Sequence, residues 1–301
     1  MAGETISRLH AGQPSATAEI NAQMRAADAT LRPHRRLVDD PYARHFVANP
    51  RYLLLRLTPG VALVGLRAFD RLFGGLLAEI LLRGRYLEEV LTATLNRGVG
   101  QVVLLGAGYD CTAWRRPELR SVRVFEVDHG ATQQRKQDIL AGLGLASGHV
   151  TFVPVDLTRD ELAGALRTAG FDVTAPALFA WLGVSYYLTV ESFAASLRAI
   201  ADVCAPGSTL VLDYMDPSVI DGTTPYRSAR LAARSVRRRG EPYTLGLDLS
   251  DVHAALVAVG FHPEDSARVP DLVRRFGGQR PYCVDHDYMG VVTASRVADG
   301  A

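Results

Sequence analysis

The pattern of apolar and polar positions changes abruptly near residue 100. Upstream of that point, apolar residues recur every three to four positions, and no strand-like alternation appears. This spacing places apolar side chains on one face of a helix. It predicts helices over 16–30, 40–47 and 85–96.

From residue 101 onward, short and nearly continuous apolar runs alternate with helical segments. Such runs are typical of parallel strands that are covered by helices on both faces. The runs are VVLLG at 102–106, VRVFEVD at 122–128, VTFVPVD at 150–156, ALFAWLGV at 177–184, STLVLDY at 208–214 and a last one at 288–294. We therefore predict an α/β fold, with an open, doubly wound, Rossmann-like sheet of seven mostly parallel strands.

The domain organisation follows from the same change of pattern. No internal repeat or low-complexity linker interrupts the chain, so we expect a single domain over 1–301. Residues 1–98 are expected to form a helical N-terminal cap region. Residues 99–301 are expected to form the Rossmann-like core, with an arginine-rich cap insertion at about 215–245 and a further helix at 249–259.

Composition narrows the expected setting of the protein. A formal net charge of +1 does not suggest a nucleic-acid partner. The three cysteines, Cys111, Cys204 and Cys283, are too far apart for a disulfide framework or a CxxC zinc site. Charged residues interrupt the apolar stretch 52–82, which predicts buried or lid-forming helices rather than a membrane span. The first twenty residues lack the layout of a signal peptide, so we expect a cytoplasmic protein. We also expect a monomer or homodimer that binds neither a metal nor a membrane.

Three successive strand ends carry residues suited to a nucleoside. The GAG sequence at 106–108 lets the backbone turn tightly and approach a ligand without Cβ clashes. Asp128 ends the next strand, about twenty residues on, where a carboxylate can accept hydrogen bonds from ribose hydroxyls. At the third strand end, Asp156 can bind the exocyclic amine of adenine while Leu157 packs on the ring. Together they predict an adenosine pocket at the carboxyl ends of the strands.

Two classes of nucleotide-dependent protein share the first two of these features. NAD(P)-dependent oxidoreductases also place an acidic residue on the ribose, but their GxGxxG fingerprint requires glycine at position 111, where this chain has Cys111. A nucleoside with a sulfonium tail carries no pyrophosphate and does not require that glycine. The residues therefore favour S-adenosylmethionine as the cofactor.

Several segments resemble the leucine carboxyl methyltransferase family and its bacterial small-molecule O-methyltransferase branch. The resemblance extends from about residue 18 to the C-terminus. The matching segments are VVLLGAGYDCTAWR at 102–115, VFEVD at 124–128, DPYAR at 40–44, RGRY at 83–86, GEP at 240–242 and GLD at 246–248. This resemblance implies a class I S-adenosylmethionine-dependent methyltransferase.

The resemblance also implies roles for individual residues. Arg83 would bind the methionyl carboxylate of the cofactor, although the same residue also fits a surface or helix-capping arginine. Gly106, Ala107 and Gly108 would lie under the methionine portion, with Asp128 at the ribose and Asp156 and Leu157 at the adenine. Tyr187 would lie near the methyl-transfer region, or would be a core aromatic residue. His129 is either a further cofactor contact or a solvated loop histidine.

One position departs from the family pattern. Leu182 stands where relatives have a glutamate near the amino end of the cofactor. A leucine side chain accepts no hydrogen bond. We therefore expect Leu182 to line the site, and backbone carbonyls or another acidic residue to bind the amino group.

The acceptor is expected to be a small molecule of specialised metabolism, methylated on a carboxylate or hydroxyl oxygen. A carboxylate is already ionised at neutral pH, whereas a hydroxyl needs a general base, for which His129, Asp110 and Tyr187 are candidates. Arginines at helical spacing between Arg227 and Arg238 either attract an acidic acceptor or form a solvated helix face.

Four alternatives remain open from the sequence. They are an NAD(P)-dependent oxidoreductase, a catalytically silent nucleoside-binding protein, a C- or N-methyltransferase on the same fold, and methylation of a protein C-terminus.

Overall fold

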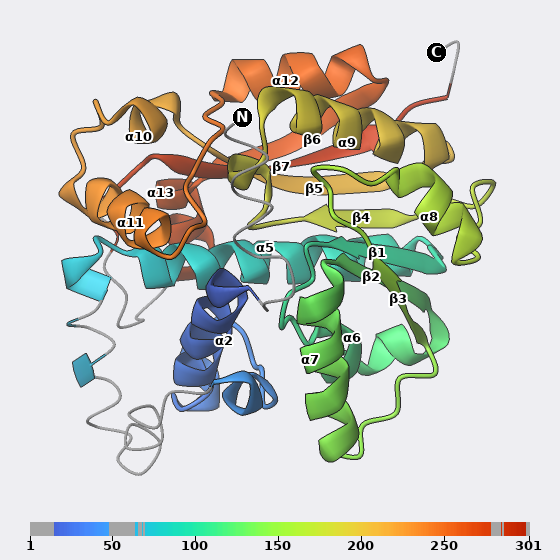
Figure 1. The fold of residues 1–301 in the computed structure, drawn as a ribbon, viewed down its shortest axis with the longest axis horizontal. Coiled ribbons are helices and arrows are strands. Elements are labelled where there is room, and N and C mark those ends of the chain that lie inside the picture. Colours follow the sequence, from blue (N-terminus) through green and yellow to red (C-terminus); the bar gives the residue numbers. More distant parts are fainter. Residues whose placement is uncertain are drawn as a thin grey trace.

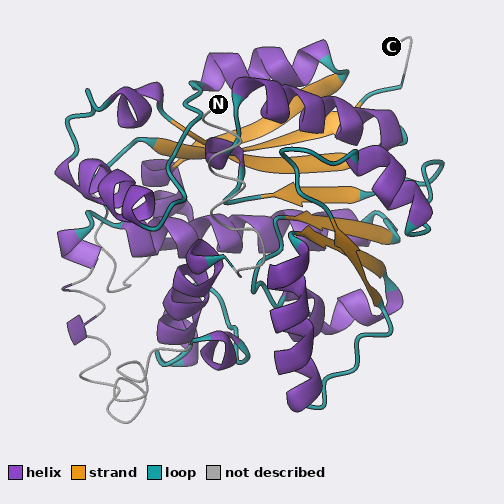
Figure 2. Ribbon diagram, in the orientation of Figure 1, coloured by secondary structure: helices purple, strands orange, loops and turns teal. Residues whose placement is uncertain are grey.

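A seven-stranded sheet forms the centre of the molecule, with helices on both faces (Figures 1 and 2). The computed structural model describes residues 15–47, 64–65, 68, 70–277, 284 and 286–298. The strand order is β3-β2-β1-β4-β5-β7-β6. The strands are β1 Gln101–Leu105, β2 Arg123–Asp128, β3 Val150–Pro154, β4 Leu178–Trp181, β5 Thr209–Met215, β6 Phe261–Arg268 and β7 Met289–Arg296. Strands β1 to β5 pair in parallel, and β7 runs antiparallel to both β5 and β6.

Helices follow the strands as in a doubly wound fold. The helices are α2 Ala16–Asp28, α5 Leu76–Asn96, α6 Thr112–Arg115, α7 Gly130–Gly142, α8 Leu162–Thr168, α9 Val190–Val203, α10 Pro217–Asp221, α11 Arg227–Arg238, α12 Leu249–Ala258 and α13 Val269–Leu272. In the part of the chain that the structure describes, no helix combines the length and apolar character needed to cross a membrane.

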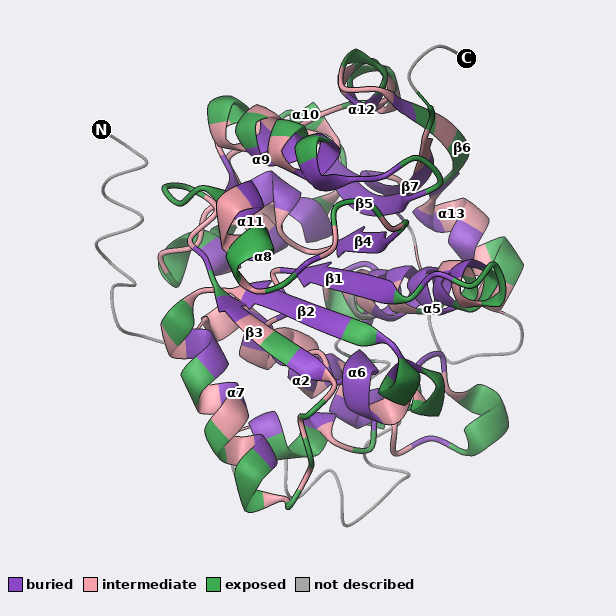
Figure 3. Cartoon of the chain, turned by 90° about the vertical axis from the view of Figure 1, so that its right-hand side faces the viewer, coloured by how far each residue is buried: buried purple, intermediate pink, exposed green. Residues whose placement is uncertain are grey.

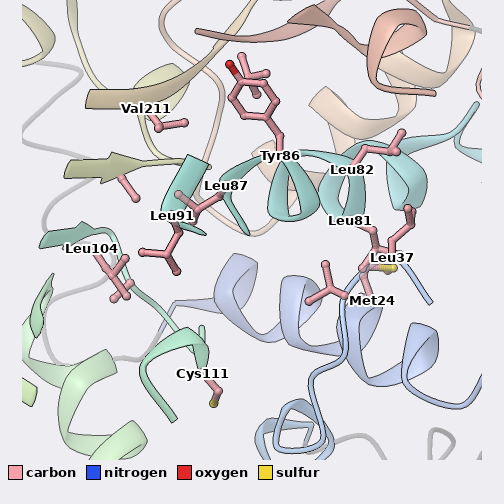
Figure 4. Close-up of a cluster of buried hydrophobic side chains, with 14 of the residues drawn as sticks. Met24, Leu37, Leu81, Leu82, Tyr86, Leu87, Leu91, Leu104, Cys111 and Val211 are labelled. Atoms are coloured by element: carbon pink, nitrogen blue, oxygen red, sulfur yellow. The ribbon is translucent and has the colours of Figure 1, made fainter. Parts of the chain in front are cut away.

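Two hydrophobic clusters form the core, one on each face of the sheet. Val102 and Leu104 of β1 pack with α2, α5, α6 and α7. Figure 4 shows the side chains that α5 contributes to this cluster. Val103 and Leu105 point to the opposite face and pack with α8, α9 and α12. Because successive strand side chains alternate between faces, a continuous apolar run is what a strand buried on both faces requires. The central strands are accordingly buried throughout (Figure 3).

The six apolar runs predicted as strands are confirmed, but the pattern did not locate the seventh strand. That strand is β6, FHPEDSAR, at the edge of the sheet beyond β7. In it only Phe261 and Ala267 are buried, and the register shifts between Pro263 and Asp265. An edge strand with an irregular register tolerates proline and charged residues, so it carries no clear apolar alternation.

The N-terminal predictions had mixed outcomes. The helix predicted at 16–30 is confirmed as α2. The helix predicted at 40–47 is wrong, because the structure has only a 3₁₀ turn, Ala43–Phe46. The Asp40 side chain accepts hydrogen bonds from the backbone N–H groups of Tyr42 (3.1 Å) and Ala43 (3.0 Å), and so caps this turn.

Helix α5 is longer than the predicted range 85–96 and begins at Leu76. Its first half is apolar on several sides because α5 lies between the sheet and α2, where it contacts both. A helix covered on several sides lacks the pattern of apolar residues on one face from which a surface helix is predicted. Of the stretch 52–82, most of the first half lies outside the described residues, as does Cys283.

Candidate active site

A pocket of about 580 Å³ lies at the carboxyl ends of β1 to β4. Here the chain turns from β3 at one side of the sheet to β4 at the other side of β1, the switch point at which open α/β sheets bind ligands. Strand-end loops form the floor of the pocket, and helix α2, helix α5 and residues 241–244 contribute the other walls. Its volume is ordinary for a site that encloses a small molecule.

The loop after β1 depends on its two glycines. Gly106 has φ +64°, and a Cβ there would lie 2.1 Å from Cγ2 of Val184. Gly108 has φ +50°, and a Cβ there would lie 3.1 Å from Cβ of Ala18 on α2. Side chains at either position would therefore be strained or would clash. Ala107 is buried between them and also lines the pocket.

Asp128 ends β2 directly beside this loop, as the sequence predicts. One carboxylate oxygen accepts a hydrogen bond from the Gly108 N–H (2.6 Å), and the other accepts from the His129 N–H (2.7 Å). Burial raises the pKa of Asp128, and the two N–H groups oppose that rise. Each oxygen keeps a lone pair with which to bind a ribose hydroxyl.

His129 serves as the N-cap of α7. Its Nδ1 accepts a hydrogen bond from the Ala131 N–H at 3.3 Å, and the residue is half-buried in the pocket wall. The His129 ring therefore stabilises the start of α7, next to the Asp128 carboxylate.

Asp156 and Leu157 follow β3 and line the far end of the pocket. Asp156 Oδ1 accepts hydrogen bonds from the backbone N–H (3.0 Å) and the hydroxyl (2.6 Å) of Thr158. The Arg159 Nε lies 3.8 Å from Asp156 Oδ2. Leu157 packs against the core cluster under α8 and α9 and offers an apolar surface to a ring.

Arg83 reaches the pocket from α5 and is buried. Its Nη1 donates to Tyr186 Oη (2.7 Å), Asp213 Oδ2 (2.8 Å) and Glu79 Oε1 (3.3 Å). Its Nε and Nη2 make no hydrogen bond with the described residues, while Gly183 lies close to Nη2. Burial would lower the pKa of Arg83, but Glu79 and its other neighbours outweigh it and raise the pKa. The free edge of the guanidinium matches the fork geometry that binds a carboxylate.

The two acids behind Arg83 are buried with it. Asp213, at the end of β5, also accepts the Gly183 N–H at 2.8 and 2.9 Å through its two oxygens. Burial raises the pKa of Asp213, and Arg83 opposes that rise. Burial also raises the pKa of Glu79 to about 7, again against the attraction of Arg83. Neither acid lines the pocket, whereas Leu182 does.

Tyr187 lines the pocket next to two other tyrosines. The ring centroids of Tyr186 and Tyr243 lie 5.0 and 5.3 Å from that of Tyr187. Burial raises the pKa of Tyr187 well above its usual value and that of Tyr243 to about 12. Both phenols are therefore protonated at neutral pH and can act as hydrogen-bond donors.

Sequence reasoning missed the residues of α2 that form one wall of the pocket. Ser15 and Thr17 line it, and both donate hydrogen bonds to the carboxylate of Glu241 in the loop after α11. The Ser15 hydroxyl lies 3.0 Å from Glu241 Oε1, and the Thr17 N–H lies 3.1 Å from Oε2. The GEP segment at 240–242 was the available signal, but nothing in the sequence showed which segment it contacts.

The arginine-rich segment forms a helix beside the pocket rather than a wall of it. The predicted spacing is confirmed by α11, which lies at the left in Figure 1. None of its arginines lines the pocket. Arg227, Arg234, Arg237 and Arg238 are exposed, and none has a carboxylate within 4.0 Å among the described residues.

The fold and the pocket define a class I methyltransferase. The strand-end residues fit S-adenosylmethionine, because the glycine loop leaves room that a Cβ would fill and Asp128 is oriented toward the pocket by two N–H groups. Two solved structures have the same fold over nearly the whole chain. One is a protein from Thermobifida fusca YX described as a methyltransferase, with a TM-score of 0.58 and 16% identity over 97% of this chain and 98% of that chain. The other is a DUF574 family protein from Streptomyces avermitilis MA-4680, with a TM-score of 0.58 and 14% identity over 91% and 96%.

The chain belongs to the leucine carboxyl methyltransferase family, whose model matches residues 18–201. A protein of Mycobacterium sp. (strain KMS), named as an S-adenosyl-L-methionine-dependent methyltransferase, is 32% identical over 242 residues, 76% of this chain and 75% of that protein. YktD of Bacillus subtilis (strain 168), which has the same kind of name, is 39% identical over 164 residues. That match spans about half of each chain, 54% of this one and 54% of YktD. The protein is thus an S-adenosylmethionine-dependent methyltransferase, as the resemblance predicted.

Proposed function

We propose that this methyltransferase methylates a carboxylate oxygen of a small molecule. The pocket has a volume of about 580 Å³, and α2 and the loop at 241–244 contribute to its walls, which suits a small acceptor. The proposal includes the placement of the cofactor, with adenine at Asp156 and Leu157, ribose at Asp128, and the methionyl part over the glycine loop with its carboxylate on Arg83.

The observation that carries this proposal is the state of the three candidate general bases. Tyr187 holds its proton because burial raises its pKa. Burial alone would raise the pKa of Asp110, but Arg25 and Arg115 outweigh it and lower the pKa to about 2, which makes this carboxylate a weak base. The His129 ring caps α7 beside Asp128, at the ribose end of the pocket. An acceptor that is already ionised requires none of them.

S-adenosylmethionine supplies an electrophilic methyl group, so that a C–O bond forms as the S–CH₃ bond breaks and its electron pair stays on sulfur. The protein orients the acceptor and excludes water, which can lower the barrier by ~7–11 kcal/mol. Tyr187 would form part of the wall against which the acceptor packs. The exposed arginines of α11 would raise the local concentration of an anionic acceptor by long-range attraction.

A labelling experiment tests the proposal. Wild-type protein is incubated with methyl-labelled S-adenosylmethionine and matched sets of small carboxylic acids, alcohols and amines, with Asp128→Asn as a control in which cofactor binding is weakened. We expect label only in the acids, as methyl esters that release labelled methanol at high pH. Label that stays in an alkali-stable ether or amine would contradict carboxyl methylation and support a hydroxyl or nitrogen acceptor.

A further inference from the structure

Among the residues that the structure describes, four carboxylates line the pocket, and three of them are committed to other contacts. Both oxygens of Asp128 accept backbone N–H groups beside the ribose position. Asp156 binds Thr158 at the adenine end, and Glu241 binds Ser15 and Thr17 of α2. The fourth is Asp110, in the loop that continues from the two glycines.

Asp110 has one oxygen available to a ligand. Its Oδ1 accepts a hydrogen bond from the Thr112 N–H at 2.5 Å. Its Oδ2 makes no hydrogen bond with the described residues, and the side chain is only half-buried in the pocket wall. The Lys136 ammonium donates to the backbone carbonyl of Asp110 and so fixes the loop beneath it.

Asp110 lies near three cations but makes no direct ion pair with any of them. Three cations lower its pKa, and each of them also contacts another carboxylate, although Arg115 shares Glu88 with Arg85. The pairs are Arg25 with Asp40 at 2.9 Å, Lys136 with Glu126 at 2.6 Å, and Arg115 with Glu88. Asp110 itself has no ion-pair partner within 4.0 Å among the described residues. Its Oδ2 is therefore available to a cationic group of a ligand in the pocket.

We propose that Asp110 binds the amino group of S-adenosylmethionine. This inference rests on the cofactor placement given under Proposed function. Leu182 lines the same pocket and has no side-chain acceptor, while Asp213 and Glu79 lie behind Arg83 and outside the pocket lining. The ammonium would lie between Arg83, which takes the neighbouring carboxylate, and the loop that carries Asp110. In this chain Asp110, in the loop after β1, would thus bind the amino group in place of an acidic residue at position 182.

Calorimetry with two matched ligands tests the inference. S-adenosylhomocysteine carries the amino group, and its deamino analogue keeps the carboxylate and the nucleoside but lacks the amino group. Wild-type protein is expected to bind S-adenosylhomocysteine about tenfold or more tightly than the analogue. Asp110→Asn keeps an oxygen for the Thr112 N–H, and is expected to reduce this preference to less than threefold by weakening only S-adenosylhomocysteine. Leu182→Glu, introduced into the Asp110→Asn protein, is expected to restore most of the preference.

Each other outcome overturns the inference in a recognisable way. An undiminished preference in Asp110→Asn shows that another group binds the amino end. Equal losses for both ligands show that Asp110 supports the loop only, and Asp138→Asn, an exposed acid on α7, controls for charge removal at a distance. If wild-type protein binds neither ligand, the cofactor placement under Proposed function fails as well.

Discussion

The two sides of the pocket are built in different ways. On the strand-end side, hydrogen bonds join residues close in sequence: Asp128 binds Gly108, twenty positions away, and Asp156 binds Thr158. On the helix side, the partners are far apart: Arg83 binds Asp213, 130 positions away, and Ser15 binds Glu241, 226 positions away. The strand-end side is therefore prepared by local turns, whereas the helix side exists only once the whole chain has folded.

This difference has an energetic consequence. The helix side buries an arginine and two acids together, so losing one leaves a buried charge without compensation, which is strongly destabilising. On the strand-end side the carboxylates are half-exposed to the pocket and bound mainly by backbone groups. Substitutions on the two sides are therefore expected to separate stability from cofactor binding.

The largest effect is expected at Arg83. Arg83→Met leaves Asp213 and Glu79 buried without their cation and should lower the free energy of unfolding by about 3–5 kcal/mol. Chemical denaturation measures this change. Arg85→Met is the matched control, because Arg85 is exposed on the same helix and its partner Glu88 keeps Arg115 as a second cation. This substitution should cost less than about 1 kcal/mol. Similar losses of stability in both variants would show that the buried cluster of Arg83, Asp213 and Glu79 stabilises the protein no more than the Arg85–Glu88 pair does.

The next effect is expected at Asp128 and concerns binding rather than stability. Asp128→Asn loses the ionised acceptor for the ribose, which should weaken S-adenosylhomocysteine binding by about 1.5–3 kcal/mol, measured by calorimetry. The free energy of unfolding should change by about 1 kcal/mol, because the amide oxygen still accepts one backbone N–H. A loss of stability as large as that of Arg83→Met would contradict the expectation that strand-end substitutions affect cofactor binding more than stability.

The smallest effect is a pH dependence on the helix side. The pKa of Glu79 is about 7 in the folded protein, above its usual 4.5, so its protonated form favours folding. That stabilisation is complete below pH 4.5 and is lost as the pH rises through 7. Glu79→Gln removes the titration, and its stability relative to wild type should rise between pH 5 and pH 8 by on the order of 2 kcal/mol. Glu89→Gln, an exposed acid on the same helix, should show no such trend in thermal unfolding. A flat difference for Glu79→Gln would mean that Arg83 keeps Glu79 ionised.

How far the sequence predicts each element depends on its surroundings. Strands β1, β4 and β5 were predicted because burial on both faces requires unbroken apolar runs. Strand β6 and the 3₁₀ turn at Ala43–Phe46 were not, since an irregular edge pairing and a side-chain cap at Asp40 leave no periodic signal. Helix α5 was predicted only in its second half because its first half is covered on several sides.

By itself, the sequence determined the apolar strands, the glycine loop and the acids at the strand ends, because each is written in a short local pattern. The structure brings all of the predicted site residues to one pocket, from Arg83 to Tyr187. Only the tertiary structure decided that Asp213 pairs with Arg83, that Glu241 binds the start of α2, and that Oδ2 of Asp110 is left without a hydrogen bond among the described residues. Those contacts join segments more than a hundred residues apart, or depend on which groups meet in one place, and no local pattern encodes either.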